Sequence, residues 1–465
     1  MEIVWHRRDL RVADNAALSA CARPLPVFVL NDEVLGHASP PRVAFLLDAL
    51  RSLRGDYRAL GGDIVVERGN PREVLPRLAD EYDASVRWNR DYSGLARERD
   101  DEVRGALRDA GVEFTDHKDS VLHEPDEIFT NAGDPYSVFT YYHKKWKERD
   151  KDEPYPEPEK VVEPDESGEI PTLNALGFDA PEADVPDAGT KEARELLDDF
   201  LAADVYEYAE SRDYPERRCT SRLSPHLKYG TVGVREVWQA TQEAKEDTSD
   251  EDERESVEEF QAQLAWREFY TQVLYHNPSV VSRNYKEYEN EIEWRNDEGE
   301  IEAWKDGETG YPIVDAGMRQ LRTEAFVHNR VRMIVASFLT KDLLTDWHVG
   351  YSWFREKLVD HDTGNDNGGW QWAASTGTDA QPYFRIFNPM TQGERYDEDA
   401  EYIKKYVPEL RDVPAEKIHS WHELDEEERD ELASDYPTPV IDHSERREAA
   451  LSMFKKARGE DDEEG

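Results

Sequence analysis

The sequence predicts an α/β domain with a Rossmann-like parallel sheet, followed by a long connector and a C-terminal all-helical domain. Over residues 1–116, short apolar runs alternate with amphipathic stretches, which is typical of a parallel sheet with helices on both faces. From about residue 192 to 457, apolar residues recur at helical spacing with little strand signal. A chain of 465 residues is also too long for one ordinary core.

The first domain is predicted to hold five strands and three long helices. The expected strands are Ile3–Trp5, Val27–Leu30, Ile64–Val66, Val86–Trp88 and Val112–Phe114. The expected helices are Pro41–Leu60, Pro71–Tyr82 and Leu95–Ala110, and two of them begin with Pro, which the first helical turn tolerates. Neither GxGxxG nor GxxxxGK follows a predicted strand, so the domain carries neither common phosphate-loop motif.

Pro, Glu and Asp dominate residues 150–190, and such a composition predicts an extended connector. The predicted segments are therefore an α/β domain over 1–130, a connector over 131–191, a helical domain over 192–457 and an acidic tail over 458–465.

The composition is strongly acidic, because 58 Lys and Arg stand against 104 Asp and Glu, for a formal charge of −46. The acids are spread along the whole chain, which predicts a protein that stays hydrated in the salty cytoplasm of a halophile. At molar salt the Debye length is ~3 Å, so only local charge matters. Met318–Lys357 is locally basic, with seven Arg or Lys against four Asp or Glu. It is either a chance cluster or a phosphate-facing patch.

Cys21 and Cys219 are the only cysteines and form no CxxC, so we expect a reduced cytoplasmic protein without disulfides. The chain has no apolar run of 18 residues and no signal peptide. We expect no membrane partner, and a monomer is the default.

Two segments carry side chains suited to binding. The hydroxyl-rich run Thr220–Ser224 precedes a predicted helix, where it either caps the helix or presents donors to a phosphate. Gln263, Trp266, Arg267 and Tyr270 share one helical face. An aromatic stripe is usually core, but a buried guanidinium needs a partner, and the stripe also suits a wall that stacks a base and hydrogen-bonds its edge.

A third group lies further along the chain. Asn329, Arg330 and Met333 occupy adjoining helical positions. Arg332 is predicted to pair with a carboxylate of the run Asp360-His361-Asp362, and the resemblance described next selects Asp360. No further His or Cys stands at ligand spacing, so we expect no metal site.

The chain resembles the photolyase/cryptochrome family over nearly its whole length. The most specific motif is Gly368–Asp379. It is supported by Val4–Leu18, Gly133–Thr140, Gly310–Arg319 and the run from Asp379 to Pro389. Within the family it is most similar to a cyclobutane pyrimidine dimer photolyase, because His328-Asn329 and Met333 stand where (6-4) photolyases carry His-His and His. The acidic composition adds the expectation of a halophilic archaeon.

The resemblance implies a U-shaped FAD in the helical domain and a pyrimidine dimer flipped out of DNA into a hole above it. Photoexcited reduced FAD would donate an electron to the dimer, which splits and returns the electron, as expected of a deoxyribodipyrimidine photo-lyase. The residues implied to hold FAD are Tyr208, Thr220, Ser221, Arg222, Leu223, Ser224, Arg332, Asp360, His361, Asp362 and Asp366.

The same resemblance assigns lesion contacts and an electron path. The residues implied to contact DNA or the lesion are Gln263, Trp266, Arg267, Asn329, Arg330, Met333 and Trp372. Trp370, Trp347 and Trp294 match the three-tryptophan wire through which the flavin is photoreduced from the surface.

Two residues depart from the repair pattern. Gln263 stands where dimer-repairing members usually carry Glu, and Asp366 stands beside flavin N5, where photolyases usually carry Asn. An ionised Asp366 next to an anionic reduced flavin is disfavoured by burial and like charge, so a protonated carboxyl is expected. An acid that can protonate the flavin is typical of signalling, so the alternative is a cryptochrome-type photoreceptor with little or no repair activity.

The antenna chromophore is less defined. Leu95 and Ala96 stand where folate-using relatives carry Asn-Glu. Methenyltetrahydrofolate is therefore not expected. An 8-hydroxy-5-deazaflavin suits an archaeal halophile, and we expect it as the second chromophore.

Overall fold

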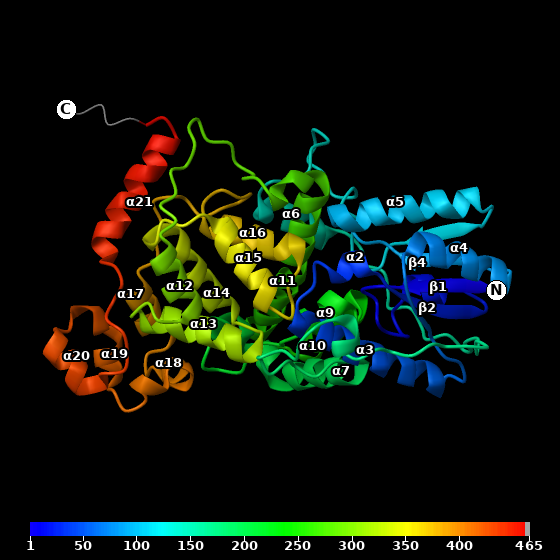
Figure 1. Ribbon diagram of the computed structural model, residues 1–465, viewed down its shortest axis with the longest axis horizontal. Coiled ribbons are helices and arrows are strands. Elements are labelled where there is room, and N and C mark those ends of the chain that lie inside the picture. Colours follow the sequence, from blue (N-terminus) through cyan, green and yellow to red (C-terminus); the bar gives the residue numbers. More distant parts are fainter. Residues whose placement is uncertain (461–465) are drawn as a thin grey trace.

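The computed structural model describes residues 1–460 and has two domains side by side (Figure 1). The first contains a five-stranded, all-parallel sheet in the order β3-β2-β1-β4-β5. Its strands are β1 (Glu2–His6), β2 (Pro24–Leu30), β3 (Val65–Arg68), β4 (Ser85–Asn89) and β5 (Phe114–His117). All five predicted strands are confirmed, with bounds shifted by a few residues.

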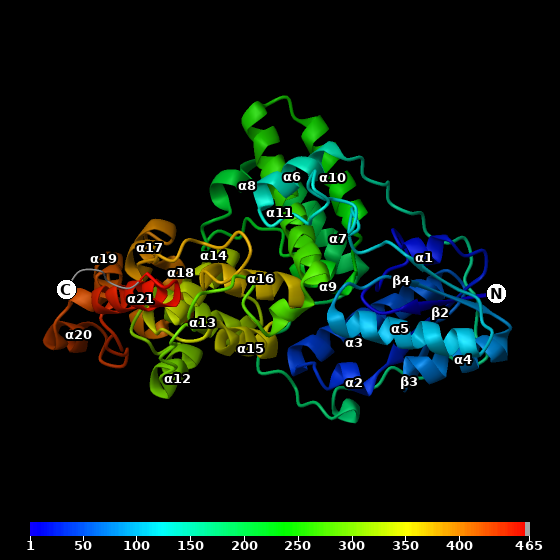
Figure 2. The same cartoon turned by 90° about the horizontal axis from the view of Figure 1, so that it is seen from above.

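Successive side chains of β1 point to opposite faces of the sheet, as in any strand, and therefore pack into two separate cores. Val4 packs with residues of α3, whereas Ile3 and Trp5 pack with residues of α4 and α5. The helices of this domain are α1 (Ala16–Ser19), α2 (Asp32–Leu35), α3 (Pro40–Ala59), α4 (Pro71–Tyr82) and α5 (Gly94–Asp109). The three predicted helices and the Rossmann-like architecture are therefore confirmed (Figure 2).

The segment expected as a connector contains one helix, α6 (Phe139–Glu148), and one short 3-10 turn, η1 (Asn174–Leu176). Phe139 and Tyr142 of α6 pack on Phe269 of α11 (Glu251–His276). Most of residues 149–189 has no regular structure and runs along the surface of both domains (Figure 2). The helix was not separated from the connector in the prediction, although Phe139, Tyr142 and Trp146 stand at helical spacing.

The second domain is helical throughout the described chain, as predicted. Its α-helices besides α11 are α7 (Thr190–Asp199), α8 (Val205–Ser211), α9 (Ser224–Tyr229), α10 (Val234–Asp247), α12 (Glu298–Asp306), α13 (Pro312–Glu324), α14 (Asn329–Ser337), α15 (Trp347–Lys357), α16 (Thr363–Ala373), α17 (Pro389–Tyr396), α18 (Glu401–Tyr406), α19 (Ala415–His419), α20 (Glu426–Ala433) and α21 (His443–Ala457). Two π-helical segments are η2 (Phe200–Asp204) and η4 (Phe338–Asp342), and three 3-10 turns are η3 (Pro278–Val281), η5 (Pro408–Leu410) and η6 (Trp421–Glu423).

A buried ion cluster joins the two domains. Arg235 of α10 is almost fully buried and lies 2.6 Å from carboxylate oxygens of both Asp14 and Asp119. Buried charged groups of this kind hold a fixed geometry because breaking the pair leaves a charge without compensation. The junction therefore fixes the first domain against α9 and α16, which carry the site.

No helix among residues 1–460 has both the length and the apolar character needed to cross a membrane. Of the acidic tail expected over 458–465, residues 461–465 lie outside the described part of the chain.

Candidate active site and a second cavity

Arg332, Asp360 and Ser224 form the centre of the candidate site. Arg332 Nη2 of α14 lies 2.7 Å from Asp360 Oδ2, and Ser224 Oγ at the start of α9 donates to the same oxygen at 2.6 Å. The predicted pair between Arg332 and Asp360 is therefore confirmed. The other carboxylate oxygen, Asp360 Oδ1, is buried without a hydrogen-bond partner among the described residues. A buried acceptor of this kind costs free energy unless a donor reaches it, so the site suits a ligand that donates a hydrogen bond there.

Asp366 and His361 form a second pair beside this centre. His361 Nδ1 lies 2.6 Å from Asp366 Oδ2, and Arg332 Nη1 lies 3.7 Å from Asp366 Oδ1. The His361 side chain is buried, and burial lowers its pKa while the nearby Asp366 opposes that shift. Arg332 thus contacts two carboxylates, which together outweigh the effect of burial and raise its pKa.

Asp362 performs two tasks at the start of α16. Its Oδ1 accepts hydrogen bonds from the backbone N–H groups of Gly364 and Asn365 at 3.1 Å, which caps the helix. Its Oδ2 lies 2.7 Å from Arg8 of the first domain. Burial alone would raise the pKa of Asp362, but the cations of Arg8 and Lys228 hold it well below its usual value. The carboxylate therefore ties the site to the first domain.

The run Thr220–Ser224 does not cap α9. The N-cap residue is Leu223, and no side chain makes a capping hydrogen bond there. The helix-cap interpretation is therefore wrong: Ser224 Oγ is bound to Asp360, and Ser221 Oγ accepts only a long hydrogen bond of 3.5 Å from the backbone N–H of Leu223. Arg222 has a left-handed backbone with φ of 52°. The turn lies next to α8, where Tyr208 is buried with the Arg212 guanidinium over its ring.

On the predicted lesion face of α11, Trp266 is stacked on Phe139, with 3.6 Å between ring centroids. The Gln263 amide donates to the backbone carbonyl of Glu259 at 3.0 Å and to its side chain at 3.2 Å. Arg267 does not join these residues. Its guanidinium donates to the carbonyl of Ser120 at 2.6 Å and to that of Leu227 at 3.3 Å, so its contacts are with the domain junction.

The remaining predicted lesion residues lie on α14 and α16, which pack against each other, as α16 does against α11. Asn329 is exposed, and its amide lies 3.8 Å from Met333 Sδ. Arg330 pairs with Asp213 at 2.6 Å and lies over the ring of Tyr396. Trp372, at the end of α16, is half-buried, with its ring centroid 6.4 Å from that of Phe387.

Close helix contact at this point depends on glycine. A Cβ at Gly368 would lie 2.1 Å from the ring of Tyr270 of α11, and one at Gly350 of α15 would lie 2.1 Å from the ring of Trp370. Both glycines therefore allow α16 to approach its neighbours.

The three predicted wire tryptophans belong to one region of the helical domain. Trp347 and Trp370 are buried in the same core, and the half-buried Trp294 packs against it. Trp347 Nε1 donates to Asn284 Oδ1 at 2.9 Å. The structure thus places the three indoles in, or against, one core.

The basic window Met318–Lys357 does not form one phosphate-facing patch. Lys341 is fully buried, and most of the other cations have acidic partners: Arg319 with Glu409, Arg322 with Asp306, Arg330 with Asp213, Arg332 with Asp360, and Lys357 with Glu356. Residues close in sequence here face different sides of the domain, because helical periodicity distributes them.

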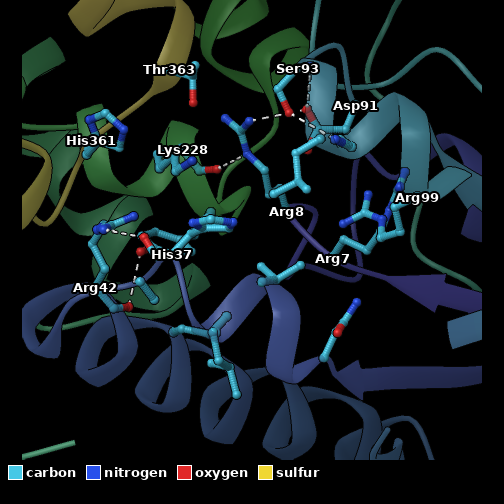
Figure 3. Close-up of a pocket in the computed structure, with 18 of the residues that line it drawn as sticks. Arg7, Arg8, His37, Arg42, Asp91, Ser93, Arg99, Lys228, His361 and Thr363 are labelled. Atoms are coloured by element: carbon cyan, nitrogen blue, oxygen red, sulfur yellow. Dashed lines mark hydrogen bonds and ion pairs between the residues drawn. The ribbon is translucent and has the colours of Figure 1, made fainter. Parts of the chain in front are cut away.

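A cavity of about 420 Å³ between the domains was not predicted (Figure 3). Its cations are Arg7, Arg8, Arg42, Arg99, Lys228 and Arg355, and its apolar lining includes Val34, Leu35, Leu46 and Leu95. These residues come from segments far apart in the sequence, so no local motif announces the cavity. Asp91 is its one acidic lining residue in the described chain.

Three of the cavity cations have no carboxylate oxygen within 4 Å among residues 1–460. They are Arg42, Lys228 and Arg355. Burial and, secondly, the charge of Arg8 lower the pKa of Lys228 to about 7. Burial also lowers the pKa of Arg42. In a chain with a formal charge of −46, such a basic cavity suits an anionic ligand with an apolar ring.

Residues 2–159 match the DNA photolyase family, and residues 260–456 match the FAD binding domain of DNA photolyase. The chain is 60% identical to the "Deoxyribodipyrimidine photo-lyase" of Halobacterium salinarum, over 99% of this chain and 100% of that one.

The chain belongs to the DNA photolyase family. Among solved structures, it is similar to a bacterial class III photolyase from Agrobacterium tumefaciens, with a TM-score of 0.91, 36% identity and 98% coverage of both chains. It is also similar to an archaeal photolyase from Sulfolobus tokodaii described with two FAD molecules, with a TM-score of 0.84 and 33% identity over 98% of this chain and 100% of that one. The two-domain photolyase fold expected from the sequence is thus confirmed.

The residues of the candidate site fit FAD. The buried Asp360 Oδ1 lacks a donor, and Arg332 and Ser224 orient that carboxylate from two sides. A flavin ring carries N–H groups able to supply the missing hydrogen bond. Arg332 and Asp360 lie within residues 260–456, the part of the chain that matches the FAD binding domain.

Proposed function

We propose that the protein is a deoxyribodipyrimidine photo-lyase, a carbon–carbon lyase that uses light to split cyclobutane pyrimidine dimers in DNA. The observation that carries this proposal is the 60% identity, over the full chain, to a relative of that name. FAD, when bound and reduced, supplies the electron that splits the dimer. The protein's own groups bind, orient and desolvate the reacting partners, as in other cofactor enzymes.

We assign FAD binding to three groups of side chains. Tyr208 and the Thr220–Ser224 turn would hold the diphosphate and ribityl chain. Arg332 and Asp360 would border the flavin ring, supported by the orphan oxygen of Asp360, while His361, Asp362 and Asp366 complete that side. Because Asp362 is engaged by Arg8 and the start of α16, it acts mainly by fixing the loop.

Lesion binding is assigned to side chains of α11, α14 and α16. Trp266 and Trp372 would wall the flipped dimer, and Gln263, Asn329, Arg330 and Met333 would contact it. Arg267 is assigned to the junction instead, because two backbone carbonyls occupy its guanidinium. Trp370, Trp347 and Trp294 would carry electrons from the surface to the flavin.

The second cavity is the proposed antenna site. Its apolar wall suits a tricyclic ring, and Arg42, Lys228 and Arg355 suit an acidic ring hydroxyl or an anionic tail. The Sulfolobus tokodaii structure is described with two FAD molecules as implying a novel light-harvesting cofactor, so this relative holds a second chromophore. We propose a deazaflavin of the 8-hydroxy-5-deazaflavin class, since Leu95, one of the residues expected to replace the folate-binding pair, lines the apolar wall.

Substitution of the cavity cations tests the antenna proposal. Lys228→Met and Arg42→Met should remove the second chromophore's absorption while the FAD content stays unchanged. Arg51→Met is the matched control, because Arg51 lies on α3 like Arg42 but is exposed and paired with Asp48. This variant should retain the second chromophore. Mass spectrometry of the released chromophore identifies its class, and a folate would overturn the assignment.

A second candidate function is a cryptochrome-type blue-light photoreceptor, favoured by Gln263 and Asp366. Gln263 lies on α11, where its amide donates to the carbonyl of Glu259, and Asp366 lies on α16, with Oδ1 3.7 Å from Arg332. One experiment separates the two functions: reduced holoenzyme is mixed with dimer-containing DNA in molar salt and illuminated with blue light. Repair predicts light-dependent loss of dimers, whereas unchanged dimer content would overturn the photo-lyase proposal. We expect the active form to be a cytoplasmic monomer.

A further inference from the structure

Asp366 has a partner that its sequence context did not reveal. The Nδ1 atom of His361 lies 2.6 Å from Asp366 Oδ2, a distance typical of a charge-assisted hydrogen bond. Both side chains are nearly buried, with 5% of the His361 side chain and 10% of the Asp366 side chain exposed. Little water therefore competes for this bond.

Asp366 also faces a cation on its other side. Arg332 Nη1 lies 3.7 Å from Asp366 Oδ1, while the Arg332 Nη2 atom binds Asp360 at 2.7 Å. A nearby guanidinium favours the charged form of a carboxyl group. The pairing with His361 and the charge of Arg332 thus oppose the protonation that was expected for Asp366 from the sequence.

The surroundings of His361 come from four other elements. Arg332 reaches the pair from α14, Arg42 lies on α3, Lys228 lies on α9, and Tyr351 of α15 places its ring centroid 5.5 Å from that of His361. Arg42 and Lys228 are cationic groups that disfavour a second positive charge on the imidazole. A neutral imidazole with its proton on Nδ1 donates to Asp366, and this arrangement satisfies the carboxylate without adding a cation.

We propose that His361 is a positioning residue that holds Asp366 as an ionised carboxylate, turned toward Nδ1 of His361 and the guanidinium of Arg332. Nδ1–H donates to Oδ2, and Asp366 itself carries no acidic proton. This inference deepens the proposed function and rests on FAD being bound beside Asp366. It explains how an Asp replaces the usual Asn there without providing an acid that could protonate the flavin.

His361 also lines the second cavity, together with Tyr351, Arg42 and Lys228. The proposed pair therefore stands between the candidate flavin site and the proposed antenna site. His361 borders the second cavity, while Asp366 and Arg332 border the candidate flavin site.

Infrared spectroscopy of dark, oxidised holoenzyme tests the protonation of Asp366 directly. The spectrum of the Asp366→Asn variant, a change of nearly equal volume, is subtracted from that of the unaltered protein. We expect the difference to contain carboxylate bands and no carbonyl band of a protonated acid. A protonated-acid band in this difference would overturn the proposal.

The role of His361 is tested in His361→Phe, which keeps a ring beside Tyr351 but removes Nδ1. We expect a protonated-acid band to appear in this variant and to vanish in His361→Phe/Asp366→Asn. The matched control is His226→Phe, because His226 is equally buried but bonds Thr231 Oγ1 at 2.8 Å instead of a carboxylate. An unchanged Asp366 signal in His361→Phe would overturn the role of His361.

If His361→Phe fails to fold, ¹⁵N NMR of histidine-labelled unaltered protein decides the same point. We expect the His361 signal to show a protonated Nδ1 throughout the neutral range, and an unprotonated Nδ1 would overturn the proposal. None of these measurements uses repair. Loss of dimer repair with the infrared result intact would therefore contradict the proposed function and leave the pairing of His361 with Asp366 standing.

Discussion

The indole of Trp266 lies flat on the ring of Phe139, with 3.6 Å between centroids and 9° between planes. Phe139 belongs to α6, so a helix outside the main helical bundle covers one face of this indole. Tyr270 packs beside it at 5.5 Å. The ring is therefore oriented before DNA arrives, which reduces the ordering cost of binding.

Trp266→Ala is expected to weaken binding of dimer-containing DNA about 5- to 150-fold. This range follows from the roughly 1–3 kcal/mol that stacking of one base on an aromatic ring contributes. FAD content should not change, because Trp266 is not among the proposed flavin contacts. Fluorescence anisotropy in the dark, with damaged and undamaged oligonucleotides, measures the effect.

Trp353→Ala is the matched control for that substitution, since Trp353 is also half-buried but packs near Lys305 and Lys357. Trp353→Ala should leave the affinities for damaged and for undamaged DNA unchanged. An equal loss for damaged and undamaged DNA in Trp266→Ala would contradict a specific role in lesion binding.

Trp347→Phe should slow photoreduction of oxidised enzyme at least tenfold and leave repair by chemically pre-reduced enzyme nearly intact. Trp347 is fully buried, and Phe preserves most of its packing but is harder to oxidise. Flavin absorbance under blue light follows photoreduction, and a single-turnover assay follows repair.

Trp304→Phe provides a strict control for the wire, because Trp304 is also fully buried and its ring lies 6.1 Å from Trp370. Trp304 therefore packs beside Trp370 without belonging to the proposed path. Equal slowing in both variants would show that packing, rather than a defined sequence of indoles, controls electron entry.

Periodicity and pairing chemistry were enough to predict much of this molecule. The alternation of strands with helices predicted the parallel sheet. The pair between Arg332 and Asp360 was predicted because a guanidinium and a carboxylate each needed a partner. These inferences depend on local spacing or on complementary charge, which a sequence displays directly.

Side-chain direction could not be predicted in the same way. Arg267 shares a helical face with Trp266, yet its long side chain reaches carbonyls of the domain junction. The cavity cations Arg42, Lys228 and Arg355 meet only because the two domains dock. His361 was expected to contact the cofactor as one residue of a run, while its bond to Asp366 depends on the turn before α16.

Asp360→Asn should lower the free energy of unfolding by about 3 kcal/mol and release FAD. Breaking a buried ion pair typically costs 3–5 kcal/mol, and the lower value applies because one fifth of the Arg332 side chain is exposed. Denaturant unfolding in molar salt and FAD retention on gel filtration measure the two effects.

The control for this prediction is Asp306→Asn, which removes the partner of Arg322 at 3.0 Å on the surface. Exposed pairs contribute ~0–1 kcal/mol, so its stability should barely change. If Asp360→Asn behaved like Asp306→Asn, the pair with Arg332 would have no special role in the site.

Glu268 is a buried carboxyl group on α11 whose ionisation should make stability depend on pH. It accepts hydrogen bonds from Trp146 Nε1 at 2.7 Å and from the backbone N–H groups of Leu122 and His123. Burial raises the pKa of Glu268 to about 7, against the opposing effect of these donors. A raised pKa means that folding favours the protonated form. Its stabilising contribution is therefore complete below about pH 4.5, the ordinary Glu value, and is lost as pH rises through 7.

Glu268→Gln should remove this pH dependence, because an amide mimics the protonated acid. The difference in unfolding free energy between the unaltered protein and Glu268→Gln should shift in favour of the variant from pH 5 to pH 8 and then level off. Denaturant unfolding at constant molar salt measures it, and taking the difference cancels titrations common to both proteins. A difference that is flat across this range would mean that Glu268 stays ionised in the fold, held by its three N–H donors.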